Sequence, residues 1–88
     1  MKLSVVIPLF NESAVLSLLI NEVHHNLMTL GEAFEVVCVD DGSADDTLQQ
    51  LLEMKSEKRE LKVVSLSRNF GLQPAIAAGL EYTKGEFV

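Results

Sequence analysis

The sequence predicts an α/β fold in which helices cover both faces of a doubly wound, Rossmann-like parallel sheet. Three short apolar runs rich in β-branched residues occur at residues 3–7, 34–39 and 61–66. Each run is near-continuous rather than alternating, as expected of parallel strands that are covered on both faces. Segments with helical spacing of apolar residues separate the runs. The resulting order, in which strands and helices alternate, is that of a doubly wound sheet.

The first strand is expected to stop pairing at Pro8, because proline has no N–H and a fixed φ. Asn11 and Glu12 then begin the first helix, with Asn11 as a candidate N-cap. The alternative is a backbone bend that lays a ligand ring along the strand end, where Phe10 offers a flat apolar face. Apolar residues at three- and four-residue spacing define the helix, and Gly31 is a plausible stop: Val15, Leu19, Val23, Leu27 and Leu30.

Two further helices follow the second and third strands. The second opens with the stretch Ser43-Ala-Asp-Asp46, which is close to a capping box with aspartate in place of glutamate. The third begins near Gln73, tolerates Pro74 in its first turn and is expected to stop at Gly85. Residues 85–88 then read as the first part of a fourth strand, in a sheet of order 3-2-1-4.

Composition narrows the classes of function. The 88 residues, of which 48% are hydrophobic, suit one small domain, and 13 acidic against 7 basic residues give a net charge of −6. This balance argues against nucleic acid as a partner. The single cysteine, Cys38, lies in an apolar run and predicts a buried thiol in a reducing compartment. No stretch has the length of a signal peptide or of a membrane span, so we expect a cytoplasmic location.

Three unusual segments follow the three strands: "PLFNE", "DDGSADD" and "SRNFGLQ". The carboxyl ends of parallel strands lie at one edge of a sheet, where doubly wound proteins bind their ligands. We call this edge the rim. The convergence of all three segments on the rim is the strongest indication of a binding site in the sequence.

The acidic segment divides into two parts. Ser43, Asp45 and Asp46 are explained by capping of the second helix. The pair Asp40 and Asp41 is not needed for that cap, and Gly42 follows it. A carboxylate of this pair is suited to accept a hydrogen bond from a base N–H or a ribose hydroxyl. It is also a candidate metal ligand, although two neighbouring aspartates are weak evidence for a metal.

Arg68 and Asn69 stand at the end of the third strand, before Gly71. The guanidinium of Arg68 is suited to a phosphate or carboxylate partner, or it neutralises the aspartate pair across the rim. His24 and His25 lie in the first helix and are read as surface or half-buried side chains. The sequence contains no recognisable nucleophile–base constellation and no dinucleotide fingerprint after the first strand.

The stretches "VVIPLFNE", "VVCVDDGSADDT" and "LSRNFGLQPAIAAGL" together resemble family 2 glycosyltransferases, which have the GT-A nucleotide-sugar-binding fold. The third stretch is similar to the branch of dolichol-phosphate mannose synthase and bactoprenol glucosyltransferase. The resemblance spans essentially all 88 residues. It implies that this chain contributes nucleotide-sugar-binding residues at nine positions: Pro8, Phe10, Glu12, Asp40, Asp41, Arg68, Asn69, Gly71 and Gln73.

The resemblance also implies what lies past Val88. The family's Asp-x-Asp motif, which holds Mg²⁺ or Mn²⁺ on the diphosphate, and its catalytic base follow the fourth strand. Residues 1–88 are therefore expected to be the incomplete N-terminal part of a longer enzyme that acts in cell-envelope glycan synthesis at the cytoplasmic face of the membrane. That enzyme would transfer a sugar from a UDP- or GDP-sugar to an acceptor, with polyprenyl phosphate as the expected one. The chain alone is expected to have no catalytic residue, no metal and no activity.

Two other readings remain open at this stage. A receiver-like signalling domain is also doubly wound with carboxylates on its rim, but it needs a phosphoacceptor aspartate after the third strand, where this chain has "LSRN". The second open reading is a non-catalytic binding or assembly module. The isolated chain is further expected to self-associate through the exposed edge of its first strand.

Overall fold

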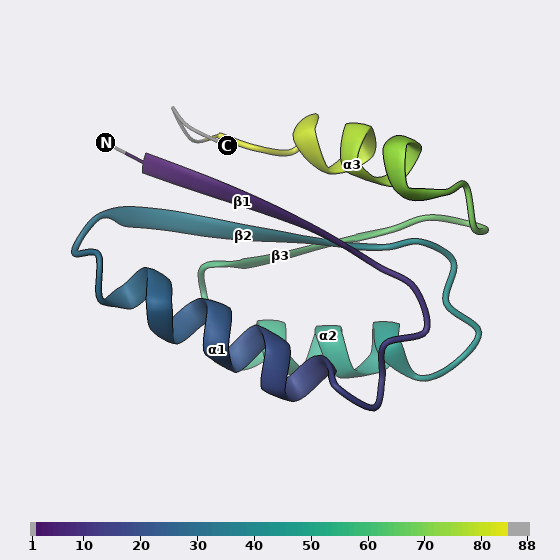
Figure 1. The fold of residues 1–88 in the computed structure, drawn as a ribbon, viewed down its shortest axis with the longest axis horizontal. Helices are drawn as coiled ribbons and strands as arrows, with labels where there is room; N and C mark the ends of the chain where they lie inside the picture. Colours follow the sequence, from purple (N-terminus) through teal and green to yellow (C-terminus); the bar gives the residue numbers. More distant parts are fainter. Residues whose placement is uncertain (1, 85–88) are drawn as a thin grey trace.

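The computed structural model describes residues 2–84 as three layers, with a parallel sheet between helices on both faces (Figure 1). The sheet has the order β1-β2-β3, with β1 at Lys2–Leu9, β2 at Ala33–Asp40 and β3 at Leu61–Ser65. Both strand pairs are parallel, with Val6 opposite Val37 and Cys38 opposite Val63. The predicted fold class and the predicted order of these three strands are confirmed, whereas the expected fourth strand, residues 85–88, lies outside the described residues.

The helices α1 (Leu16–Met28) and α2 (Thr47–Glu57) lie on one face of the sheet, and α3 (Leu72–Leu80) lies on the other (Figure 1). Alternate residues of β2 supply the two cores. Val36 and Cys38 pack with Ile20 of α1 and Leu51 of α2, whereas Val37 and Val39 pack with Ala75 of α3. This division explains why β2 reads as a continuous apolar run, since both of its faces are covered. The thiol of Cys38 is buried, which raises its pKa to about 12.

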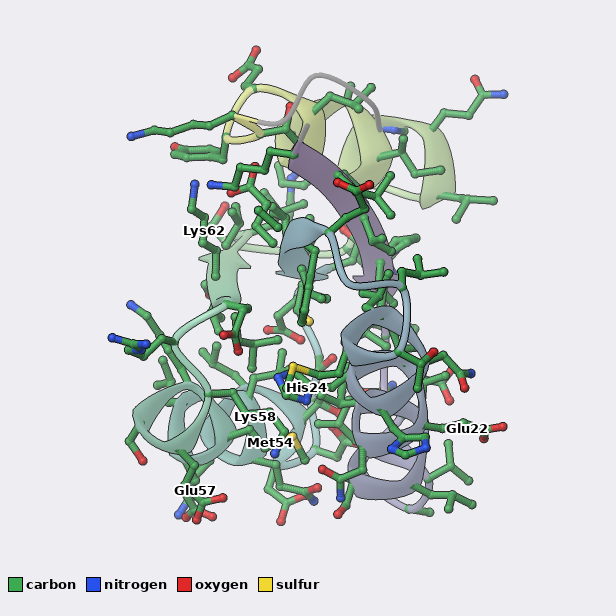
Figure 2. The ribbon with its side chains drawn as sticks, turned by 90° about the vertical axis from the view of Figure 1, so that its left-hand side faces the viewer. Glu22, His24, Met54, Glu57, Lys58 and Lys62 are labelled. Carbon is green, nitrogen blue, oxygen red and sulfur yellow. The ribbon has the colours of Figure 1, made fainter. Side chains whose placement is uncertain are left out.

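The apolar stripe of α1 agrees with the predicted one at Leu19, Val23 and Leu27, which pack in the core on this face of the sheet. Its fully covered residues are Leu16 and Ile20, with Leu27 nearly so, while Val15 and Leu30 lie outside the helix and are about half exposed. The predicted stop is confirmed, because Gly31 follows the helix end with a φ of 71°. Figure 2 shows α1 and α2 side by side, with His24 and Met54 between them and Glu22 and Glu57 pointing outward. His24 is half-buried and His25 exposed, as predicted.

Two predicted element ends are wrong. Pro8 does not end β1, which continues to Leu9 with Pro8 opposite Val39. The carbonyl of Leu9 points towards β2, where it accepts a hydrogen bond from the Asp41 N–H. Because neighbouring residues of a strand direct their backbone groups to opposite sides, the backbone of Pro8 points away from β2. The missing N–H of proline therefore removes no hydrogen bond between β1 and β2. The third helix ends at Leu80 rather than at Gly85, which is outside the described residues. Its last turn tightens, because the N–H groups of Tyr82 and Thr83 bond carbonyls three residues back.

A buried carboxylate fastens the opposite end of the sheet. The Oε2 atom of Glu35 accepts hydrogen bonds from the Ser4 hydroxyl and the Lys84 N–H, each at 2.5 Å. Its Oε1 atom lies 2.6 Å from the Nζ atom of Lys62, which also donates to the Tyr82 carbonyl at 3.2 Å. Burial favours a higher pKa for Glu35, but the hydrogen bonds from Lys62, Ser4 and Lys84 outweigh it and lower the pKa to about 2.

This network predicts a difference in acid stability between the wild type and Glu35→Gln. The folded-state pKa of Glu35 lies below its ordinary value of 4.5. Its contribution to stability is therefore complete above pH 4.5 and is lost as the pH falls towards 2, by about 3 kcal/mol. Denaturant unfolding at several pH values should show the wild type and Glu35→Gln converging across this window. A stability difference that does not change with pH would contradict the assignment.

Among residues 2–84, β1 pairs with β2 alone. The expected self-association through the outer edge of β1 stays a prediction, and sedimentation of the protein tests it.

Candidate functional site

The three segments that follow the strands meet at the rim, which is the right-hand side of the molecule in Figure 1. Backbone hydrogen bonds continue the sheet into them: Asp41 donates its N–H to the Leu9 carbonyl at 2.8 Å, and Leu66 donates to the Asp40 carbonyl at 2.9 Å. The loops therefore leave the sheet side by side, which is the convergence that the sequence predicts.

A hollow of about 250 Å³ opens between the first and third of these loops. Phe10, which is 44% exposed, and Leu72, which is 65% exposed, give it apolar walls. The carboxylate of Asp41 and the amide of Asn69 give it polar groups. Of the nine residues assigned to nucleotide-sugar binding, six line this hollow: Pro8, Phe10, Glu12, Asp41, Asn69 and Gly71.

Asp41 holds the third loop in place. Its Oδ1 atom accepts the N–H of Phe70 at 2.9 Å, and its Oδ2 atom accepts the N–H of Gly71 at 3.1 Å and the side-chain amide of Asn69 at 3.3 Å. Gly71 is the N-cap residue of α3, so this carboxylate fixes the start of that helix. The expectation that the second helix does not need the aspartate pair as a cap is confirmed, since the N-cap residue of α2 is Asp46. The role of Asp41 at the start of α3 was not predicted, because its backbone partners lie 29 and 30 residues further along the chain.

Asp40 is equally buried but less engaged. Only 2% of it is exposed, and its Oδ1 atom accepts one long hydrogen bond, from the Ser43 N–H at 3.4 Å. A buried carboxylate with so few donors is unfavourable unless another group supplies a hydrogen bond or a positive charge. It does not line the hollow.

Arg68 and Gln73 are the other two predicted residues outside the hollow. The guanidinium of Arg68 stacks 4.4 Å from the ring centre of Phe70, and within residues 2–84 no ion pair joins it to Asp40 or Asp41. Arg68 therefore makes no direct ion pair with the aspartates, and its neutralising role across the rim stays a prediction. Gln73 lies exposed in the first turn of α3.

The predicted capping role is wrong for Asn11 and holds in part for the acidic segment. Helix α1 starts at Leu16, so Asn11 is not its N-cap, and Asn11 adopts a φ of 53°. Helix α2 starts at Thr47, and Asp46 occupies its N-cap position without a side-chain capping bond. Asp45 accepts the N–H of Thr47 at 3.0 Å, and the side chains of Ser43 and Asp45 also accept N–H groups from residues 11 and 13.

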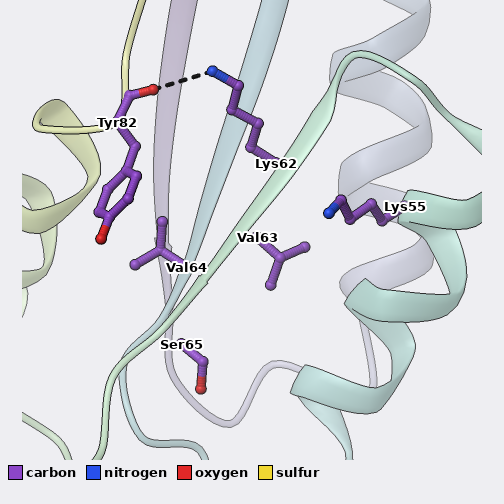
Figure 3. A pocket seen from close by; sticks show the side chains of 6 residues that line it. All are labelled: Lys55, Lys62, Val63, Val64, Ser65 and Tyr82. Atoms are coloured by element: carbon purple, nitrogen blue, oxygen red, sulfur yellow. Dashed lines mark hydrogen bonds between the residues drawn. The ribbon is translucent and has the colours of Figure 1, made fainter.

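A second hollow, of about 340 Å³, lies along the free edge of β3 rather than at the rim (Figure 3). Lys55, Lys62 and Tyr82 surround it, and Lys62 is already engaged by the Tyr82 carbonyl. None of the nine predicted residues lies there.

The rim offers recognition groups rather than a reaction centre. It combines acceptor oxygens, an amide and apolar faces, which suit a flat ring bearing N–H groups. In the described part of the chain, no three His, Cys, Asp or Glu side chains are grouped in a way that could hold a metal ion. Sequence reasoning missed Phe70, Leu72 and Thr47, whose positions depend on contacts across loops.

The comparisons with known proteins agree with this picture. The model of the family described as Glycosyl transferase family 2 matches residues 4–88. The chain is 42% identical over 87 residues to the uncharacterized glycosyltransferase sll0501 of Synechocystis sp., covering 99% of this chain and 27% of that protein. It is 44% identical over 87 residues to undecaprenyl-phosphate 4-deoxy-4-formamido-L-arabinose transferase of Pseudomonas aeruginosa, covering 97% of this chain and 25% of that protein.

Among solved structures, residues 1–349 of TarS from S. aureus resemble the chain with a TM-score of 0.76 and 34% identity, over 100% of this chain and 27% of that one. The chain thus spans about a quarter of the length of the relatives that it matches. None of the helices in residues 2–84 combines the length and the apolarity that a membrane span requires.

Proposed function

This chain belongs to glycosyl transferase family 2, and on that premise we propose that it is the nucleoside-binding part of an enzyme that transfers a sugar from a nucleotide diphosphate sugar. The observation that carries the proposal is the hollow at the rim, where Asp41 and Asn69 face the apolar walls of Phe10 and Leu72. Membership of the family excludes the receiver-like alternative. In the proposed reaction, an acceptor oxygen attacks the anomeric carbon, and the nucleoside diphosphate leaves.

The base and ribose are the proposed ligands of the rim. Asp41 has one lone pair left beyond its bonds to Asn69, Phe70 and Gly71. Each carboxylate oxygen accepts two hydrogen bonds, and Oδ1 accepts only the Phe70 N–H. Asp40, which adjoins Asp41 but does not line the hollow, accepts only the long bond from Ser43, and a base N–H or a ribose hydroxyl would supply a further donor. The donor in this proposal is a UDP- or GDP-sugar, because both uracil and guanine present ring N–H groups.

Polyprenyl phosphate is the proposed acceptor. The support is similarity to a transferase whose name specifies undecaprenyl phosphate, at 44% identity. Such an acceptor would place the enzyme at the cytoplasmic face of a membrane. The described residues do not fit Mg²⁺ or Mn²⁺, because no grouping of ligands exists among them and Asp41 is engaged by N–H donors. That the complete enzyme binds a metal stays a proposal.

Transfer activity tests the proposal. The full-length protein, incubated with radiolabelled UDP- or GDP-sugars and undecaprenyl phosphate, is expected to release the nucleotide diphosphate and to form a labelled lipid. Asp41→Asn should reduce kcat/KM by about tenfold or more, because the mismatched amide loses acceptor bonds worth ~1–3 kcal/mol. Surface plasmon resonance without acceptor separates donor binding from transfer. A protein that binds neither UDP nor GDP would overturn the proposal.

A further inference from the structure

The first and second loops of the rim are joined by side chains that do not line the hollow. We call this set of hydrogen bonds the strap; it connects residues 11–13 with residues 43–47. Backbone N–H groups of the first loop donate to side chains of the second, and one side chain of the first loop accepts in return. Each loop thus satisfies polar groups that the other leaves unpaired.

Thr47 is at the centre of the strap. It is fully buried, and its Oγ1 atom accepts the N–H of Glu12 at 3.0 Å. The same hydroxyl donates to the Oδ1 atom of Asp45 at 2.5 Å. The hydroxyl therefore acts both as acceptor and as donor. Valine fills the same volume but can do neither.

Asp45 extends the chain of bonds from Thr47. Its Oδ2 atom accepts the N–H of Ser13 at 3.2 Å, and its Oδ1 atom also accepts the N–H of Thr47 at 3.0 Å. The hydrogen bond from the Thr47 hydroxyl, together with those from the N–H groups of Thr47 and Ser13, lowers the pKa of Asp45 to about 2.

Asn11 both donates a hydrogen bond to the second loop and accepts hydrogen bonds from it. Its N–H donates to the Ser43 hydroxyl at 2.9 Å, and its Oδ1 atom accepts the N–H groups of Ala44 at 2.8 Å and Asp45 at 3.4 Å. Its left-handed backbone, with a φ of 53°, is the conformation that asparagine tolerates better than most residues. The bend at Asn11 is therefore fixed from both sides.

The residues on either side of Asn11 are the ones that face the proposed ligand. Phe10 and Glu12 line the hollow, and Asp41 lies across from them on the second loop. We infer that Thr47 and Asp45 are positioning residues, which set the place of Phe10 and Glu12 relative to Asp41 without touching the nucleotide. This inference rests on the proposed function, since it assigns the strap to that same site. It also gives Asp45 a role in addition to its hydrogen bond at the start of α2.

Three hydroxyl variants of the full-length protein test the inference by calorimetric titration with UDP and GDP. Thr47→Val, which keeps the volume, is expected to weaken the affinity about tenfold, and Thr47→Ser to restore it to within about twofold. Ser4→Ala is the matched control, because Ser4 is also fully buried and also donates to a carboxylate, Glu35, but at the other end of the sheet. It should lower the melting temperature and leave the affinity unchanged.

Equal losses of affinity in Thr47→Val and Ser4→Ala, or an unchanged affinity in Thr47→Val, would overturn the inference. Amide hydrogen exchange of the ligand-free protein supplies a second readout. Residues 11–13 should exchange at least tenfold faster in Thr47→Val than in the wild type, and not in Ser4→Ala. Unchanged exchange there would overturn the strap itself. A wild type without nucleotide affinity would instead overturn the proposed function, and with it the positioning role, while the exchange still decides whether the strap exists.

Discussion

Replacement of Asp41 by alanine is expected to lower the free energy of unfolding by about 3 kcal/mol and to remove measurable nucleotide binding. The variant removes the partly buried hydrogen bonds from the N–H groups of Phe70 and Gly71 to the carboxylate, and each hydrogen bond to a charged group contributes about 1.5–3 kcal/mol. It also removes the carboxylate that faces the hollow. Denaturant unfolding measures the first effect, and calorimetric titration with UDP and GDP measures the second.

Asp46→Ala is the control for Asp41→Ala, because Asp46 belongs to the same acidic segment but is exposed, and its side chain bonds only the Gln50 side chain in the described structure. Its stability should change by no more than about 0.5 kcal/mol, and its nucleotide affinity should stay that of the wild type. Similar losses of affinity in both variants would show that the segment acts through its total charge. That result would contradict the distinct role of Asp41.

Gly42→Ala should cost about 3 kcal/mol of stability. Gly42 has a φ of 68°, where a Cβ atom is strained by ~1–2 kcal/mol. An added Cβ would also lie 2.5 Å from the Asn69 nitrogen and closer still to the carbonyl carbon of Arg68, so the second and third loops would have to move apart. Overpacking of this kind costs a further ~1–3 kcal/mol. The movement would widen the site and weaken nucleotide binding as well.

The chain contains a matched control for this prediction. Gly31 has a nearly equal φ of 71°, but nothing lies within 4 Å of an added Cβ. Gly31→Ala is therefore destabilised by the backbone strain alone, and its loss of stability should be about half that of Gly42→Ala. Equal losses in the two variants, measured by urea unfolding, would refute the close approach of the two loops.

The sequence allowed the fold and the place of the site to be predicted because both depend on local patterns. The apolar run around Val37 indicates a covered parallel strand, and the polar segments fall directly after such runs. The family motifs then identify the class of ligand. The structure confirms the layers and the strand order, while the binding roles of the nine residues stay proposals.

The partners of the polar side chains were not predictable in the same way. Asp41 bonds N–H groups 29 and 30 residues away, and Asn11 reaches Ala44 across 33 residues. The segment Ser43-Ala-Asp-Asp46 has the residue types of a capping box, yet the side chains of Ser43 and Asp45 also bond the first loop. Sequence spacing cannot separate these two uses, because both satisfy backbone N–H groups with the same short side chains.

A crystal structure of the full-length protein with UDP or GDP bound tests the central claim most directly. The account predicts that the base lies in the hollow between Phe10 and Leu72, with a ring N–H or ribose hydroxyl at hydrogen-bond distance from the carboxylate of Asp41 or Asp40. A nucleotide seated along the edge of β3, beside Lys62 and Tyr82, would contradict it. So would a divalent cation coordinated by Asp40 and Asp41, because these residues would then hold a metal rather than the nucleoside.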